Sequence, residues 1–493
     1  MKKGTVTVKY FGELLRKYID KSGYTIYSIS YQSKINRTTL QKAISGDRPL
    51  SPENLEKILP YLKLTPYEKT DFEKAFLISH LGKETYKKHM LIKNITMNEK
   101  NWFHEPVSVT YSHNPITINQ STVIEGLHNI LTVVQNLIDT CTQNCDKPFL
   151  HTVSKFDSDF FPVLYSCFHA ETYEKLNVIH TIPFIKNTFS NNEYTQYNMQ
   201  QLSAILPYVI SAASRITFYY YYEENDISVF SSFPYSAYMT TNYNTILLSS
   251  DFQHALILPK ECNAYFLASQ TQIMNNSKLL FSTKLGTEIF LSATETLANV
   301  RAAHILLKQP CVFRFMDVHT PLNVLEANQL PSDQKEALIH LINLRHDHLM
   351  NLEQCFSYIS YEGYQDFVEH GILYEIPKQI GRPFSIQERL LILNKILDEN
   401  ENGSFLTILL REKSFSPKRN VLLYDNSSLF FYHSDSQNQY HLCQIHESSV
   451  ITEFCDFIDH LEKHGFSYSL TESNHIIRNS MEELEKKYNA RSK

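Results

Sequence analysis

Hydrophobic positions in the N-terminal part of the chain recur with the period of an α-helix, and polar residues suited to helix ends separate the repeats. Five short helices are therefore expected, and they cover approximately 11–21, 25–33, 36–46, 51–62 and 65–77. Asn36, Ser51 and Thr65 are residue types that cap helix N-termini. Gly46 is of the type that ends a helix. This pattern predicts a compact all-α domain over 1–95.

Beyond these helices the pattern changes twice. Residues 96–120 lose helical periodicity and contain prolines at 106 and 115, which predicts a linker. A stripe at helical spacing follows, formed by Ile124, Leu127, Ile130, Leu131, Val134, Leu137 and Ile138. This stripe is expected to be a core face, and a dimer-forming helix is the alternative. After about residue 200, short hydrophobic runs alternate with helical segments, which predicts mixed α/β structure.

Two runs in this mixed region resemble each other. One begins at Asn244 (NTILLSSD) and the other at Asn420 (NVLLYDNS), and each is followed by a second expected strand and an amphipathic helix. Two related α/β halves would produce this pattern, and chance similarity of two hairpins is the alternative. We expect a helical plus α/β domain over 121–310, for sensing or oligomerisation, and a second α/β effector domain over 311–493.

Charge divides the chain into a basic N-terminal part and an acidic remainder. Residues 1–95 hold 18 Lys and Arg against 9 Asp and Glu, a net charge of +9, and the other residues carry a net charge of −15. A basic N-terminal domain favours a polyanionic partner. The N-terminus lacks the apolar run of a signal peptide, no segment is apolar enough to span a membrane, and the eight cysteines are scattered. We therefore expect a cytoplasmic protein with no membrane partner.

The second and third expected helices carry the clearest chemistry. Their hydrophobic residues, which are Ile29, Ile35, Leu40 and Ile44, are spaced to pack inward. The outer face of the third helix then presents Arg37, Thr38, Gln41, Lys42 and Ser45. Arginine can pair with guanine, glutamine with adenine, and threonine with thymine or a phosphate. Lys42 and Arg48 are better placed for contacts with the phosphate backbone.

The run from Ile35 to Arg48 (INRTTLQKAISGDR) resembles the recognition helix and following turn of the Cro/CI (XRE) family of transcriptional regulators. The resemblance covers roughly residues 9–80. It implies a lambda-repressor-like helix-turn-helix domain whose DNA contacts are made by Asn36, Arg37, Thr38, Gln41, Lys42, Ser45 and Arg48. Two positions depart from the family pattern. Ile26 stands where a glutamine is common, and Lys34 stands at a turn position where glycine is common, so Lys34 is expected in a left-handed conformation.

Other clusters of reactive residues carry little weight. Cys141 and Cys145 lie one helical turn apart near His128 and His151, but their spacing matches no strong zinc pattern. The run 345–348 (RHDH) contains a His-Asp pair without the further ligands that a metal-dependent phosphohydrolase needs. No phosphate-binding glycine motif and no recognisable catalytic set is present. We therefore expect no metal, no cofactor and no enzymatic activity.

These observations together predict a multidomain protein with an all-α helix-turn-helix domain followed by a large α/β region. The expected function is that of a DNA-binding transcriptional regulator that reads an operator as a homodimer. Double-stranded DNA is the expected partner, together with an unidentified small-molecule or peptide effector. A helix-turn-helix module used for protein–protein contacts and an enzyme with a helix-turn-helix head are the alternatives. A peptide-sensing regulator with an all-helical receptor is less consistent with the strand-rich region after residue 200.

Overall fold

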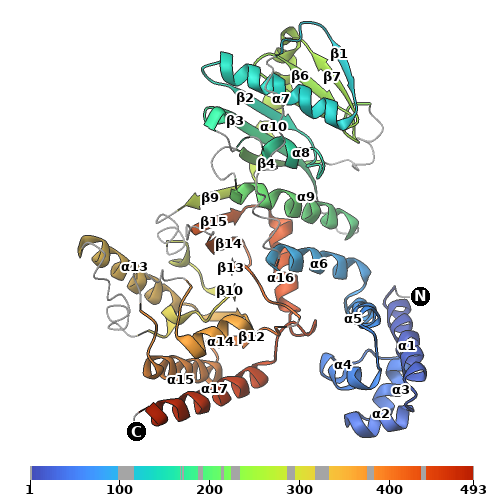
Figure 1. Cartoon of the computed structure of the whole chain (residues 1–493), viewed down its shortest axis with the longest axis vertical. Coiled ribbons are helices and arrows are strands. Elements are labelled where there is room, and N and C mark those ends of the chain that lie inside the picture. The colour runs from blue at the N-terminus through green and yellow to red at the C-terminus, as the bar shows by residue number, and fades with distance from the viewer. Residues whose placement is uncertain are drawn as a thin grey trace. The chain divides into compact units, whose positions relative to one another are not determined.

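The structure of the protein is a computed structural model (Figure 1). It describes residues 3–97, 116–166, 168, 171–186, 192–211, 216–223, 234–285, 295–316, 332–374, 382–412, 414–434 and 440–491. The chain forms two compact units, and both are discontinuous in sequence. The first unit contains Met1–Asn94, Arg301–Pro417 and Glu453–Lys493, and the second contains Ile95–Val300 and Lys418–Thr452.

The N-terminal region is helical, as the sequence predicts. It contains α1 (Lys3–Ser22), α2 (Ile26–Ser33), α3 (Arg37–Ser45), α4 (Pro52–Ile58), the 3₁₀ turn η1 (Leu59–Tyr61) and α5 (Pro66–Leu81). We call these helices the head. A further helix, α6 (Lys83–Met97), follows directly after Gly82 and was not predicted as a separate element.

Helix ends in the head are formed by the residues that the sequence marks for this role. The Asn36 side chain accepts a hydrogen bond from the backbone N–H of Thr38 at 2.9 Å, and Gly46 ends α3 with φ of 77°. Ser51 and Thr65 cap α4 and α5 in the same way as Asn36 caps α3. Local side-chain chemistry thus sets the helix boundaries in the head.

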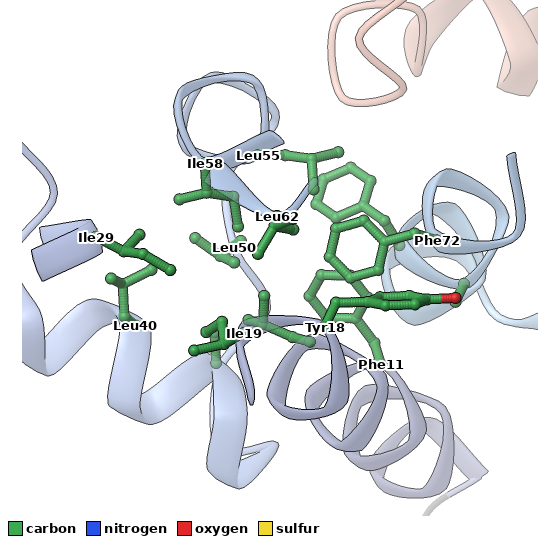
Figure 2. Packing of buried hydrophobic residues seen from close by; sticks show 14 of the residues in the cluster. Phe11, Tyr18, Ile19, Ile29, Leu40, Leu50, Leu55, Ile58, Leu62 and Phe72 are labelled. Atoms are coloured by element: carbon green, nitrogen blue, oxygen red, sulfur yellow. The ribbon is translucent and has the colours of Figure 1, made fainter. Parts of the chain in front are cut away.

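The hydrophobic core of the head joins all five helices (Figure 2). Phe11 of α1 stacks on Phe72 of α5 with ring centroids 5.1 Å apart, and Tyr18 meets the edge of Phe72 at 5.6 Å. Ile29 of α2 and Leu40 of α3 are fully buried and face each other in this core. Each such side chain contributes roughly 1.5–3 kcal/mol through burial, so the packing fixes α2 and α3 on the rest of the head.

The α/β part of the first unit contains a parallel ladder. Strand β11 (Gln354–Ile359) pairs with β10 (Ala302–Leu307) on one side and β12 (Phe405–Leu409) on the other. The associated helices are η6 (Val312–Arg314), α13 (Ser332–Met350), α14 (Tyr361–His370), α15 (Ile386–Asn402) and α17 (Leu470–Arg491). Ser360 caps α14 at the carboxyl end of β11, and its hydroxyl donates to the Lys308 carbonyl at 2.7 Å.

The second unit is built on an eight-stranded mixed sheet with strand order β1-β7-β6-β5-β2-β3-β4-β8. Its strands are β1 (Thr122–Glu125), β2 (Phe149–Val153), β3 (Asn177–Ile185), β4 (Ile216–Glu223), β5 (Ala237–Thr241), β6 (Thr245–Leu248), β7 (His254–Leu258) and β8 (Lys278–Leu279). Strands β2, β3 and β4 are parallel, and the other neighbours pair antiparallel. The helical segments are α7 (Leu127–Asn144), α8 (Phe161–Ser166), η3 (Glu171–Tyr173), α9 (Asn192–Ser211), η5 (Lys260–Cys262) and α10 (Asn263–Asn276).

The second unit also contains an antiparallel ladder. Strand β14 (Ser428–Ser434) pairs with β13 (Asn420–Tyr424) and with β15 (Tyr440–Ile445), and β15 pairs with β9 (Phe281–Leu285). Helix α16 (Ser448–Asp459) begins after this ladder, and its residues from Glu453 onward belong to the first unit.

The mixed α/β architecture after residue 200 is therefore confirmed, although details differ. Ile124 lies on β1 and not on α7, because Gly126 separates the two elements. The runs at Asn244 and Asn420 both form antiparallel hairpins, β6–β7 and β13–β14. Residues 98–115 of the expected linker lie outside the described residues. The expected domain boundaries and the relation between two halves stay predictions.

Candidate nucleic-acid interface

Helices α2 and α3 are joined by a three-residue turn whose geometry is fixed by local contacts. Lys34 begins the turn with φ of 58°, so the left-handed conformation expected for this residue is confirmed. The Ser30 hydroxyl donates to the Ile35 carbonyl at 2.7 Å and ties α2 to the turn. A lysine in this region of φ and ψ costs about 1 kcal/mol relative to glycine, and this contact helps to hold the turn in place.

The inward side of the helix pair agrees with the hydrophobic pattern. Ile29, Ile35 and Leu40 are buried, and Ile44 is half-buried. Ala43 is fully buried as well, which brings the backbone of α3 close to the core. With this side packed against the head, the opposite side of α3 must face solvent.

The structure places all seven sequence-predicted site residues on the exposed surface, on α3 or directly beside it. They are Asn36, Arg37, Thr38, Gln41, Lys42, Ser45 and Arg48. Within the described part of the chain, the side chains of Arg37, Gln41, Lys42 and Arg48 form no hydrogen bond or ion pair. These four side chains can therefore meet a partner without breaking an existing interaction.

The other three predicted residues already have partners. The Asn36 carbonyl oxygen accepts from both the backbone N–H and the hydroxyl of Thr38, at 2.9 and 2.8 Å. The Ser45 hydroxyl donates to Asp47 Oδ2 at 2.6 Å. Asn36 thus acts as a helix cap, and the hydroxyls of Thr38 and Ser45 must exchange partners before they contact a ligand.

Charge along the helix pair is of one sign. From Thr25 to Gly46 the chain contains Lys34, Arg37 and Lys42 and no Asp or Glu. Asp47 is the first carboxylate after α3, and it is held by Ser45. A surface with three cations and no anion over 22 residues is suited to a polyanionic partner.

Sequence reasoning missed two exposed aromatic residues on α2, the helix before this face. Tyr27 and Tyr31 lie one turn apart on α2, with 66% and 79% of their surface exposed. Both tyrosines lie off the buried side of α2, although they are large hydrophobic residues. Their spacing of four residues, which places them on one face of the helix, is the sequence signal that could have identified them. Their phenol groups add hydrogen-bonding capacity to the exposed surface of α2.

The clusters that the sequence argued against have local partners or face solvent. His346 Nδ1 lies 3.2 Å from the exposed carboxylate of its neighbour Asp347. Cys145 donates through its thiol to the Tyr243 hydroxyl, and Cys141 is buried. Across the described residues, no group of three or more His, Cys, Asp or Glu is arranged to hold a metal ion. No helix in the described segments is long and apolar enough to cross a membrane.

Comparison with known proteins gives a result that differs from the main expectation from the sequence. No family model matches the chain, and no curated protein matches it. Among solved structures, phosphatidylserine synthase from Haemophilus influenzae Rd KW20 aligns over 80% of this chain and 98% of its own, at 10% identity and a TM-score of 0.24. Polyphosphate kinase from Porphyromonas gingivalis aligns over 69% of this chain and 50% of its own, at 8% identity and a TM-score of 0.19.

These findings correct the expected family and function. The assignment to the Cro/CI (XRE) family is contradicted, because no family model matches and the solved structures carry the names of a synthase and a kinase. The expectations of a transcriptional regulator and of a chain without enzymatic activity are contradicted by the same matches. The physical reason is that two capped helices joined by a turn define a local structure, and a local structure does not define the function of a 493-residue chain. At these TM-scores and identities, the activities of the two enzymes do not pass to this protein.

Proposed function

We propose that α2 and α3 form a helix-turn-helix that attaches this protein to double-stranded DNA. The observation that carries the proposal is the outer face of α3, where Arg37, Gln41 and Lys42 are exposed and make no interaction within the described structure. The proposal concerns the head alone. It assigns no role in transcription, and it is compatible with an enzyme that carries a helix-turn-helix head.

The shape of the helix pair supports this partner. A major groove about 12 Å wide admits one α-helix, and the groove edges of the bases offer hydrogen-bond partners to side chains on that helix. Arg37 and Gln41 lie four residues apart and therefore share one face of α3. Arginine can bind guanine through two hydrogen bonds and glutamine can bind adenine in the same way, and each pair discriminates by about 1–3 kcal/mol.

Backbone contacts are assigned to Lys42 and Arg48. Arg48 follows the glycine that ends α3, and Lys42 lies on the last turn of that helix. Both side chains are exposed, so each can neutralise one phosphate. Each contact is expected to contribute about one unit to the slope of the salt dependence of binding.

The test measures binding of full-length protein to duplex fragments selected from a random pool, by fluorescence anisotropy at several salt concentrations. Replacing Arg37 and Gln41 together by alanine should weaken binding to the selected fragment by about 30-fold or more. The same variant should bind non-selected duplex as the wild type does. Arg16→Ala, which removes an exposed charge from α1, is the matched control and should leave both affinities unchanged.

Two outcomes would overturn the proposal. The first is equal binding of the selected fragment by the wild type and by the Arg37/Gln41 double variant. The second is weak association with DNA that does not change with salt, which would favour a head used for protein–protein contacts. Binding as a homodimer and the response to an effector stay predictions, and the spacing of half-sites in the selected fragments tests the first of them.

A further inference from the structure

Helix α6, which follows the head, is fixed to the C-terminal segment of the first unit by buried polar contacts. Lys88 Nζ lies 2.6 Å from Glu453 Oε1, and both side chains are more than nine-tenths buried. The fully buried ring of His89 lies 2.9 Å from Asp456 Oδ2 through Nε2 and 2.8 Å from His464 Nε2 through Nδ1. These contacts join residues that are more than 360 positions apart in the sequence.

The hydrogen bonds determine where the protons lie. Asp456 accepts, so His89 Nε2 carries a proton and donates it to the carboxylate. In a neutral His89 the other nitrogen is then an acceptor, and His464 Nε2–H must be the donor to it. His464 Nδ1 is left without a proton, and this buried atom has no hydrogen-bond partner in the described structure. In this arrangement His464 Nδ1 is the ring nitrogen that remains free to take a further proton.

Two more histidines surround this pair. His460 Nδ1 donates to the Asp456 carbonyl at 2.7 Å, and its ring stacks against His464 at 5.8 Å between centroids. His80 of α5 donates through Nε2 to the Leu50 carbonyl at 2.8 Å and acts electrostatically on His464. We call His80, His89, His460 and His464 the histidine cluster.

The charged groups around the histidine cluster are Lys88, Glu453, Asp456 and Lys93. The Nζ atom of Lys93 lies 4.5 Å from the centre of the Phe466 ring.

We propose that the histidine cluster is a pH-operated latch that holds α6 on the C-terminal segment at neutral pH and releases it at acid pH. An added proton would lie on His464 Nδ1, a buried atom that has no hydrogen-bond partner in the described structure. His464 would then be a buried cation whose new N–H has no acceptor, and this is costly in an interior site. The Asp456 carboxylate already accepts from His89 and forms no hydrogen bond with His464 among the described residues.

Electrostatics sets the pH range of release. Burial, followed by the neighbouring His89 and His460, lowers the pKa of His464 to about 3. Burial also lowers the pKa of His80. A histidine whose pKa is depressed in the folded state stabilises that state above its ordinary pKa of about 6.5 and loses this effect as pH falls below it. For His464 alone, lowering pH from about 7.5 to about 5 should favour the released state by about 30-fold.

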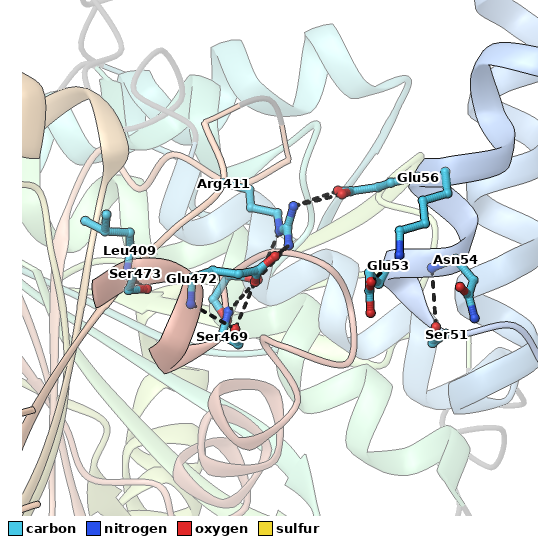
Figure 3. Close-up of polar contacts among 11 residues, drawn as sticks. Ser51, Glu53, Asn54, Glu56, Leu409, Arg411, Ser469, Glu472 and Ser473 are labelled. Atoms are coloured by element: carbon cyan, nitrogen blue, oxygen red, sulfur yellow. Dashed lines mark hydrogen bonds and ion pairs between the residues drawn. The ribbon is translucent and has the colours of Figure 1, made fainter. Parts of the chain in front are cut away.

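A second contact joins the head to the C-terminal segment of the first unit through an arginine and not through histidines. The Arg411 guanidinium lies between Glu56 of α4, at 2.8 Å, and Glu472 of α17, at 3.2 Å (Figure 3). Its Nε–H donates to the Ser467 carbonyl, and its guanidinium lies 4.4 Å from the Tyr468 ring centre. An arginine stays charged at any pH that the fold tolerates. Glu56→Gln is therefore expected to loosen the head without changing its response to pH.

The test is hydrogen exchange, read by mass spectrometry, on the full-length chain. Amide protection factors of α6 are compared at about pH 7.5 and about pH 5, with amides of α7 in the second unit as the internal reference. In the wild type, protection of α6 should fall by about 30-fold while α7 keeps its protection. In His464→Gln, whose amide can donate to His89 Nδ1 at any pH, the fall should be about threefold or less. The exposed His475 provides a matched control, and His475→Gln should behave as the wild type.

The proposal fails if α6 keeps its protection at pH 5 in the wild type, or if His464→Gln loses as much protection as the wild type. Loss of protection in α7 together with α6 would mean general acid unfolding and would overturn it as well. His89→Gln, which can donate to Asp456 and accept from His464, serves as the second variant if His464→Gln does not fold. Duplex DNA is absent from every measurement, so the result does not depend on the proposed function of α3.

Discussion

The head and the α/β part of the first unit differ in how their structure is encoded. Each helix end in the head depends on a residue at that end, such as Asn36 for α3 or Thr65 for α5. The α/β part depends on contacts between distant segments, since β10, β11 and β12 are separated by helices yet pair in parallel. Residues that end helices can be identified directly in a sequence. Pairing between strands that are distant in the sequence can be identified only in the folded chain.

The same difference extends to the polar contacts. In the head, hydrogen bonds from side chains mostly connect residues two to five positions apart, as in the contact of Ser30 with Ile35. In the first unit as a whole, the decisive contacts join residues as distant as Lys88 and Glu453. The effects of mutations in the head should therefore be predictable from neighbouring residues in the sequence. Mutations elsewhere in the first unit should disturb long-range contacts that the sequence does not indicate.

The largest effect is expected for Phe72→Ala in the head. Phe72 is fully buried and contacts the rings of Phe11 and Tyr18. Removing a buried aromatic ring leaves a cavity, so the free energy of unfolding of the head should fall by about 3–5 kcal/mol. Denaturant titration followed by exchange of head amides measures it. Tyr67→Ala, at a 77% exposed site on the same helix, should change stability by about 0.5 kcal/mol or less. Similar losses in both variants would mean that the core is not packed as described.

A large effect is also expected for Gly363→Ala in α14, where the sequence shows no glycine requirement. A Cβ atom at Gly363 would lie 1.8 Å from the Lys308 carbonyl oxygen, so the backbone must move. Overpacking of this kind should cost about 3 kcal/mol. Gly46→Ala in the head meets a positive φ of 77° and a contact of 2.8 Å with Lys9 Cα, and it should cost less. Thermal unfolding of both variants shows which one loses more stability. A larger loss of stability for Gly46→Ala would contradict the close approach of Gly363 to Lys308.

A pH effect of intermediate size is expected for His180 in the second unit. Its Nδ1 accepts from the Tyr165 hydroxyl at 2.8 Å, and its Nε2–H donates to the Ser154 carbonyl at 3.1 Å. Burial lowers the pKa of His180 to about 3. The neutral ring is therefore favoured in the folded state, and its stabilising effect is present above the ordinary pKa and lost as pH falls below it.

Between about pH 7.5 and about pH 5, this loss should lower the free energy of unfolding of the second unit by about 2 kcal/mol. Urea titrations at the two pH values measure it. His180→Gln should be less stable at neutral pH and should lose this part of the pH dependence. An unchanged pH dependence in His180→Gln would show that another group is responsible.

The smallest effect is expected for Lys34→Gly in the turn between α2 and α3. Glycine accepts the φ of 58° without strain but increases the entropy of the unfolded chain. Relief of backbone strain stabilises the folded state, and the added entropy of the unfolded chain opposes it. The free energy of unfolding should therefore change by less than about 1 kcal/mol, and it should increase if the relief of strain is the larger effect. Replacing Lys34 by valine, which is β-branched, should be clearly destabilising. Comparison of the two midpoints in urea tests whether the turn keeps its conformation.

Much of the fold could be predicted where the signals are local. The five helices of the head, the left-handed Lys34 and the hairpins at Asn244 and Asn420 were found from short patterns. Helix α6 was missed because it follows Gly82 without a polar linker. Strand order and the two discontinuous units could not be predicted, since pairing partners are separated by whole helices.

The residues of the candidate interface could be predicted from the sequence. Which of their side chains already form hydrogen bonds within the protein could not be predicted. The outward positions of Arg37 and Gln41 follow from the inward positions of Leu40 and Ile44 on the same helix. The engagement of Ser45 with Asp47 depends on rotamers, which a pattern does not specify. The histidine cluster was invisible for a stronger reason, because no periodicity links residues 89 and 464.

The division of the first unit among three segments also has a consequence during protein synthesis. Helix α6 is made early, and the segment that holds His89 in place lies 375 residues further along the chain. At about 5–20 residues per second, a ribosome needs roughly 20–75 s to cover that distance. Throughout this interval the head can fold from its own residues. The side of α6 that contacts the C-terminal segment in the folded protein has no partner during the same time. In the nascent chain Lys88 and His89 therefore stay without their partners Glu453, Asp456 and His464 until the C-terminal segment has been made.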